Sequence, residues 1–116
     1  SAISCAVNYY ATSKLMFTAA PGSFYPAPKV TSAVVRMDIR PAPAVQVEDE
    51  DGYFALIRAA FGQRRKTAAN AIASGLGLPK EKVIAAIEVA GFDARIRPEA
   101  LTLENFAAIQ RAMAAQ

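Results

Sequence analysis

The sequence has no histidine, no tryptophan and one cysteine, Cys5, among 116 residues. A single thiol cannot close an intramolecular disulfide, and the imidazole and paired thiolate ligands of a zinc site are missing. The lack of histidine also removes the commonest general base and leaves Cys5 without a group that could activate it as a nucleophile. We therefore expect no metal site, interpret Cys5 as a buried spectator, and expect a reducing, cytoplasmic location.

Long apolar segments are also missing. No run is long enough to cross a bilayer, and the first residues do not have the pattern of a signal peptide, so we expect no membrane partner. The spacing of acidic and hydroxyl residues assembles no carboxylate pair and no serine triad. The sequence therefore offers no catalytic residue in this chain.

The charge is distributed unevenly. The net charge is +3, but residues 1–51 carry four Lys or Arg and five Asp or Glu, whereas residues 52–116 carry nine and five. The positive excess in the second half indicates an anionic partner there, with nucleic acid as the leading candidate.

A proline-rich and acidic segment, residues 40–52, separates two regions of different periodicity. Before it, Ile3, Val7 and Tyr10 follow helical spacing, and residues 14–20 and 31–39 read as strands that pair antiparallel. Both strands are apolar on most of both faces, as strands inside a covered sheet are, yet nothing else in the chain reads as a strand. We expect residues 1–42 to be the edge of a larger domain, whose exposed strands invite pairing or strand swapping with a second copy.

The second region is predicted to be helical. Asp51 is a candidate cap for a helix whose apolar stripe includes Tyr53 and Phe61. A second helix is expected from about Arg65 to Ser74. Two more are expected, one opened by Pro79 and stopped by Gly91 and one capped by Thr102. The expected fold class is thus α+β, a terminal hairpin followed by a small four-helix domain over residues 43–116.

A basic turn, Arg64, Arg65 and Lys66, is expected at a corner between two helices, with Arg58 extending the patch. Arginine and lysine side chains here could bind the phosphates of a nucleic acid, with strong salt dependence and little sequence selectivity. A solvated turn without function explains the same charges.

The segment "FYPAPKV" is stiff, because Pro26 and Pro28 fix their φ angles and bias the residue between them to an extended backbone. The aromatic residues before it, Phe24 and Tyr25, could stack on an unpaired base. Physical reasoning alone favours the other interpretation, in which they fill a core under the loop.

Three segments together, "FYPAPKVTSAVVR", "AAFGQRRKTAAN" and "ARIRPEALTLENFAAI", resemble the C-terminal part of the ribosomal RNA adenine dimethyltransferases, and most closely those of the small ribosomal subunit. The resemblance covers nearly the whole chain. It implies a Rossmann-like methyltransferase sheet, of which residues 1–42 would be the last helix end and hairpin, followed by a helical RNA-binding domain.

The resemblance also implies roles for individual residues. Phe24, Pro26 and Pro28 would border the pocket for the target adenine, which reverses the interpretation of Phe24 as a core residue. The basic turn would bind ribosomal RNA. Whole members of the family transfer methyl groups from S-adenosylmethionine to the exocyclic nitrogens of two adjacent adenines and act in maturation of the small (30S) subunit.

The family's Gly-rich cofactor loop, acidic ribose-binding residue and Asn-x-Pro-Tyr-type motif are missing from this sequence. We therefore expect a C-terminal fragment that neither binds S-adenosylmethionine nor methylates by itself. The alternatives are a stand-alone RNA- or ribosome-binding helical module without catalysis, and a helical protein-interaction domain with a merely solvated basic turn.

Overall fold

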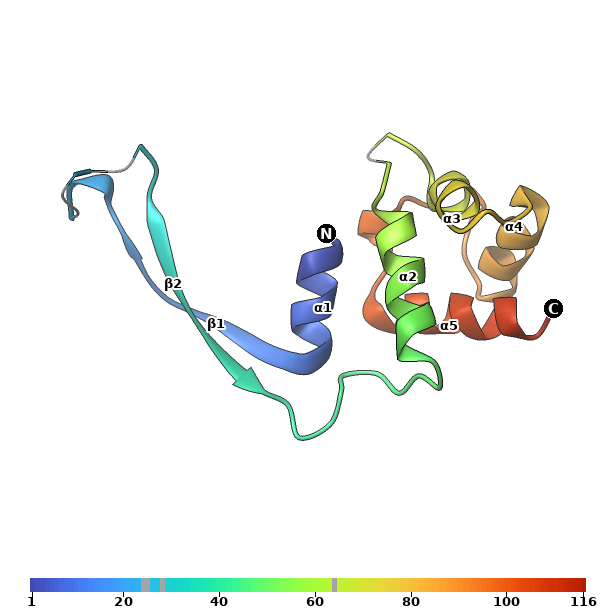
Figure 1. Ribbon diagram of the computed structural model, residues 1–116, viewed down its shortest axis with the longest axis horizontal. Helices are drawn as coiled ribbons and strands as arrows, with labels where there is room; N and C mark the ends of the chain where they lie inside the picture. The colour runs from blue at the N-terminus through green and yellow to red at the C-terminus, as the bar shows by residue number, and fades with distance from the viewer. Residues whose placement is uncertain (24–25, 28, 64) are drawn as a thin grey trace.

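The computed structural model divides into a two-stranded arm and a body of helices (Figure 1). The arm gives the molecule its long axis, with extents of 55 × 34 × 21 Å. The structure describes residues 1–23, 26–27, 29–63 and 65–116. Its elements are α1 (Ala2–Tyr10), β1 (Ala11–Ala19), a 3-10 turn (Pro21–Ser23), β2 (Ser32–Ile39), α2 (Glu50–Ala60), α3 (Ala68–Leu76), α4 (Lys80–Val89), a second 3-10 turn (Pro98–Ala100) and α5 (Leu103–Ala114).

The predicted antiparallel hairpin is confirmed. β1 pairs with β2 from Ala11 opposite Ile39 to Ala19 opposite Ser32, with an irregularity between Leu15 and Phe17. β1 starts three residues earlier than the predicted strand, because the backbone becomes extended directly after α1. In the described residues these two strands form the whole sheet.

The hairpin is apolar but covered on neither face. Leu15, Phe17 and Met37 are each more than half exposed, and Ile39 is 80% exposed. A soluble two-stranded sheet of this composition is marginal by itself. That this hairpin is the edge of a larger sheet stays a prediction.

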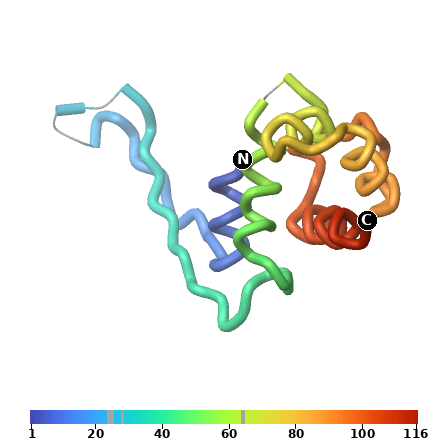
Figure 2. The backbone as a smooth tube through the Cα atoms, turned by 45° about the vertical axis from the view of Figure 1, so that its right-hand side comes forward, coloured from blue at the N-terminus to red at the C-terminus, as the bar shows by residue number. Residues whose placement is uncertain are grey.

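Helix α1 lies beside α2, as both views show (Figures 1 and 2). Tyr9 is buried and packs its ring 5.0 Å from Phe54 and 5.6 Å from Tyr53, centroid to centroid. The backbone N–H of Ala44 donates to the carbonyl of Tyr9 at 2.9 Å. The division into residues 1–42 and 43–116 stays a prediction, and α1 shares the core of the helical body.

The four expected helices after residue 43 are present, but two of their starts differ from the prediction. Asp49, not Asp51, caps α2, because its carboxylate accepts from the backbone N–H of Gly52 at 3.1 Å while Asp51 lies inside the first turn. Helix α3 begins at Ala68 rather than near Arg65, since Thr67 supplies the cap.

The later boundaries agree with the prediction. Gly77 ends α3 with φ of 66°, and Gly91 follows α4 with φ of 98°, conformations that favour glycine. Thr102 caps α5 through a reciprocal pair of hydrogen bonds with Asn105. The core between these helices is formed by apolar side chains from all of them, including Leu56, Ile57, Ile72, Val83, Ile87, Phe106 and Ile109.

Candidate nucleic-acid interface

The sequence places the predicted base-pocket residues between β1 and β2, and this end of the hairpin points away from the helical body (Figure 1). Phe24 and Pro28 fall outside the described residues. Pro26 is described and exposed. Their role in binding a target base therefore stays a prediction.

The basic turn joins α2 to α3. Arg65 and Lys66 are exposed there, and Arg64 lies outside the described residues. The turn is shaped by a hydrogen bond from the Lys66 N–H to the carbonyl of Gln63 at 3.1 Å. A second one joins the Gln63 amide Nε2 to Ser74 Oγ at 3.3 Å. The two described cations thus sit on an irregular corner, not on the helix that the sequence predicted from Arg65.

Arg58 lies exposed in the last turn of α2. In the part of the chain that the structure describes, ion pairs join Arg36 to Asp38 and Arg95 to Asp93. Within that same part, Arg58, Arg65 and Lys66 form no ion pair, and their positive charges are available to an external anion.

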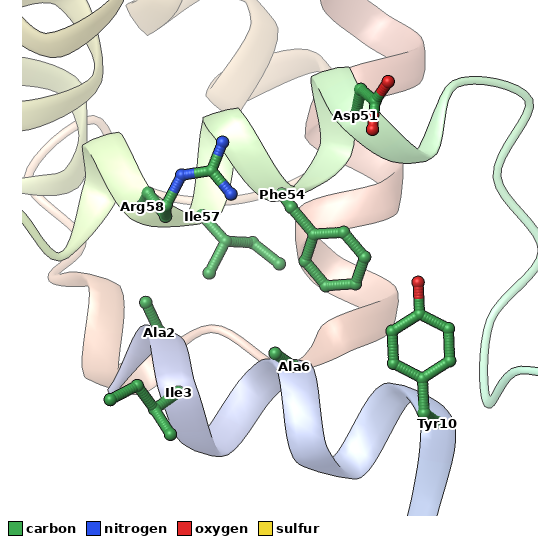
Figure 3. Close-up of a pocket in the computed structure, with 8 residues that line it drawn as sticks. All are labelled: Ala2, Ile3, Ala6, Tyr10, Asp51, Phe54, Ile57 and Arg58. Carbon is green, nitrogen blue, oxygen red and sulfur yellow. The ribbon is translucent and has the colours of Figure 1, made fainter.

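A hollow of about 410 Å³ lies between α1 and α2 (Figure 3). Phe54 and Ile57 of α2 face Ala2 and Ala6 of α1 across it. Arg58 stands at one end, and Asp51 and Tyr10 stand at the other. Sequence reasoning missed this hollow, because nothing in the local pattern places α1 against α2.

A second hollow of about 420 Å³ lies between α2 and α3. Gly75 and Ala59 line it where α3 and α2 approach closely. Arg58 borders this hollow as well as the first, and Gln63 lies on its rim. Arg58 therefore borders both hollows and lies in the last turn of α2, before the chain enters the basic turn.

The hydroxyl groups of two tyrosines, Tyr10 and Tyr53, form hydrogen bonds between elements of the fold. The Tyr10 hydroxyl donates to Glu50 Oε1 at 2.6 Å, and this hydrogen bond is the main reason that the pKa of Tyr10 rises to about 12. Tyr53 donates to the carbonyl of Leu103 at 2.7 Å, and burial raises its pKa.

Burial also raises the pKa of the Cys5 thiol, which is half-buried and not fully buried as the sequence suggested. The described residues contain no cluster of ligands suited to a metal ion. None of the helices in that part of the chain is both long and apolar enough to cross a membrane.

Comparison with known proteins decides the family. The model of the family described as "Ribosomal RNA adenine dimethylase" matches residues 1–109. The chain belongs to the ribosomal RNA adenine dimethylase family. This membership confirms the resemblance inferred from the three sequence segments.

Two relatives within the family are both called ribosomal RNA small subunit methyltransferase A. The protein of Pelotomaculum thermopropionicum is 49% identical over 109 residues, covering 93% of this chain and 37% of the relative. That of Moorella thermoacetica is 46% identical over 112 residues, covering 97% of this chain and 38% of the relative. The chain thus spans less than half the length of these relatives.

Solved structures support the fold. A dimethyladenosine transferase from Plasmodium falciparum superposes with a TM-score of 0.71 at 16% identity, covering 99% of this chain and 49% of that one. The 23S rRNA methyltransferase ErmE superposes with a TM-score of 0.64 at 18% identity, covering 98% of this chain and 46% of that one. The predicted α+β arrangement, a hairpin followed by four helices, is confirmed.

Proposed function

We propose that this chain is the C-terminal part of an S-adenosylmethionine-dependent rRNA adenine N6,N6-dimethyltransferase that methylates two adjacent adenines of small-subunit ribosomal RNA. In this proposal residues 43–116 bind the RNA, and residues 1–42 contribute one wall of the target-base pocket through Phe24, Pro26 and Pro28. The supporting relatives are ribosomal RNA small subunit methyltransferases matched over more than nine-tenths of this chain. The parent enzyme would act on the small ribosomal subunit in the cytoplasm.

The observation that carries the RNA-binding role is the exposed corner after α2. Arg58 lies in the last turn of α2, Arg65 and Lys66 lie in the connection that follows, and all three are exposed and form no ion pair with any described residue. Exposed guanidinium and ammonium groups that form no ion pair can bind phosphates without first breaking an ion pair within the protein. Arg64 belongs to the same run of sequence and is assigned the same role.

The residues present do not fit the methyl-donor cofactor. In whole family members, as the resemblance implies, a Gly-rich cofactor loop follows a strand and opens a helix. Here the glycines lie in the hairpin loop, within α2 and α3, or after helices, and the described strands belong to one hairpin. We therefore assign S-adenosylmethionine to the parent enzyme, derive no chemical step for this chain, and propose that it is inactive alone.

The alternative, a stand-alone RNA- or ribosome-binding module, is less well supported. A module that functions alone would not be expected to present Leu15, Phe17 and Ile39 to water on a bare hairpin. The helical protein-interaction domain is disfavoured by the same exposure and by the family match.

The test is RNA binding by this chain as a function of salt. The double variant Arg65→Gln, Lys66→Gln is expected to bind small-subunit ribosomal RNA more weakly and to lower the slope of log K against log salt by about 1.5. The matched control Lys80→Gln, Lys82→Gln removes two exposed cations from α4. It is expected to change neither the affinity for RNA nor the salt slope. An unchanged affinity and slope in the first variant would refute the RNA-binding role of the turn.

A separate titration tests the cofactor assignment. The chain is expected to show no saturable binding of S-adenosylmethionine by calorimetry. Micromolar affinity would show that the cofactor site lies in this chain after all.

A further inference from the structure

The hollow between α1 and α2 has two unlike walls. The α2 wall carries the bulky side chains of Phe54 and Ile57, whereas the middle of the α1 wall is formed by Ala2 and Ala6, which lie about one helical turn apart (Figure 3). Ile3 and Tyr10 of α1 also line the hollow. The two alanines leave space beside the Phe54 ring, which also stacks on the Tyr10 ring with 5.9 Å between the centroids. The volume of the hollow, about 410 Å³, falls in the usual range for sites that hold small ligands.

The two ends of the hollow differ in charge. Arg58 and Asp51 are seven residues apart on α2, which places their backbones about 10 Å apart along the helix axis. One nucleotide covers such a span from its phosphate to the far edge of its base. Arg58 can bind the phosphate, and the carboxylate of Asp51 can accept a hydrogen bond from an exocyclic amine of the base.

Arg58 also connects this hollow to the basic turn. It also borders the second hollow, between α2 and α3, and Arg65 and Lys66 follow in the connection from α2 to α3. A strand whose phosphates follow these cations would bring its next nucleotide to the slot between α1 and α2.

We propose that the hollow between α1 and α2 is a subsite for one unpaired RNA nucleotide. The base lies against Phe54 and Ile57, its amine faces Asp51, and its phosphate binds Arg58. Stacking on an aromatic face provides affinity with little sequence selectivity, and the acceptor at Asp51 disfavours uracil, which has no exocyclic amine. This inference rests on the proposed RNA-binding function and adds a site distinct from the basic turn.

The experiment measures binding of short fluorescent oligoadenylate and oligouridylate to the whole chain at several salt concentrations. Ala6→Phe fills the slot and is expected to weaken oligoadenylate binding at least about fivefold without changing the salt slope. Arg58→Gln, an exposed substitution that leaves the core intact, is expected to lower the slope by about 0.7. Asp51→Ala is expected to remove the preference for oligoadenylate over oligouridylate.

The matched control is Ala85→Phe, which makes the same change on an exposed position of α4 and is expected to leave binding unchanged. Thermal unfolding of each variant checks that the fold persists. If the basic-turn variants lower the salt slope but Ala6→Phe and Asp51→Ala do not alter binding, the subsite is refuted and the proposed function stands. If the unmodified chain binds no RNA, both fail. A change in sedimentation instead of RNA binding on Ala6→Phe would assign the hollow to contact between copies and overturn the proposal.

Discussion

Tyr10 fastens the end of α1 to the start of α2 through its 2.6 Å hydrogen bond to Glu50. This bond, aided by the negative charge of Glu50, raises the pKa of Tyr10 to about 12. A folded-state pKa above the ordinary value of about 10 means that the unfolded chain loses its proton first. The stability contributed by this pair is therefore present below pH 10 or so and is lost as the pH rises toward 12.

The first prediction follows from that pair. Glu50→Gln keeps an acceptor but removes the charge, so the pKa of Tyr10 is expected to fall toward its ordinary value. Tyrosinate absorbance during an alkaline titration measures it, and Tyr10→Phe identifies which transition belongs to Tyr10. Glu48→Gln removes a nearby exposed charge as the control. Identical titration curves for Glu50→Gln and the unmodified chain would contradict this account.

Gly75 sets the distance between α2 and α3. A Cβ at this position would lie 2.7 Å from the Cβ of Ala59, closer than real contacts allow. Alanine gains about 1 kcal/mol of helix propensity over glycine, but overpacking costs about 1–3 kcal/mol.

We therefore expect Gly75→Ala to lower the free energy of unfolding, by about 1 kcal/mol, in urea titrations. Adding Ala59→Gly restores the space, so the cost of the two changes together should be less than the sum of their separate costs. A Gly75→Ala chain as stable as the unmodified one would mean that the helices separate freely at this point.

At the scale of elements, α5 depends on its first turn. Thr102 Oγ1 accepts from the N–H of Asn105 at 3.2 Å, and the Asn105 side chain accepts from the N–H of Thr102 at 2.9 Å. Thr102→Ala removes half of this reciprocal cap and is expected to cost about 1 kcal/mol of unfolding free energy in urea. Thr102→Ser keeps the hydroxyl and should cost much less. Equal losses in both variants would assign the effect to the threonine methyl group instead.

The pairing of α1 with α2 matters at the same scale. It joins a helix that precedes the hairpin in the sequence to one that follows it. It also buries Tyr9 among the aromatic rings of the helical body. The same contact creates the hollow proposed as a nucleotide subsite. One helix–helix contact thus serves both stability and the candidate interface.

At the scale of the whole molecule, the bare hairpin is the dominant feature. Leu15 and Val35 are cross-strand partners, 58% and 49% exposed, on a sheet whose edges are unpaired in the described chain. Such strands invite pairing with another copy. We expect this chain to self-associate through the hairpin, with edge pairing or strand exchange.

Sedimentation velocity over a range of concentrations tests this. Leu15→Glu with Val35→Lys replaces an apolar pair by an opposite-charge pair and is expected to reduce association. The control is Val89→Lys, which changes an apolar residue of α4 that is 77% exposed. This variant should associate as strongly as the unmodified chain. A uniform monomer of the unmodified chain at every concentration would refute the prediction.

Much of the fold could be predicted because its signals are local. Thr102, Gly77 and Gly91 mark helix ends through caps and backbone angles that depend on a few neighbouring residues. The prediction of Asp51 as the cap of α2 was wrong, because Asp49 and Asp51 lie in one acidic run and only the turn geometry distinguishes them.

By itself, the sequence determined the strands, the helices, the basic turn and the family, since periodicity, turn residues and motifs are properties of short segments. Only the tertiary structure decided that Ala2 and Ala6 face Phe54 and that Arg58 stands between two hollows. These contacts join α1 to a helix that begins 40 residues after Tyr10. Their formation depends on how the helices pack after the chain has passed through the hairpin, and no local pattern encodes that packing.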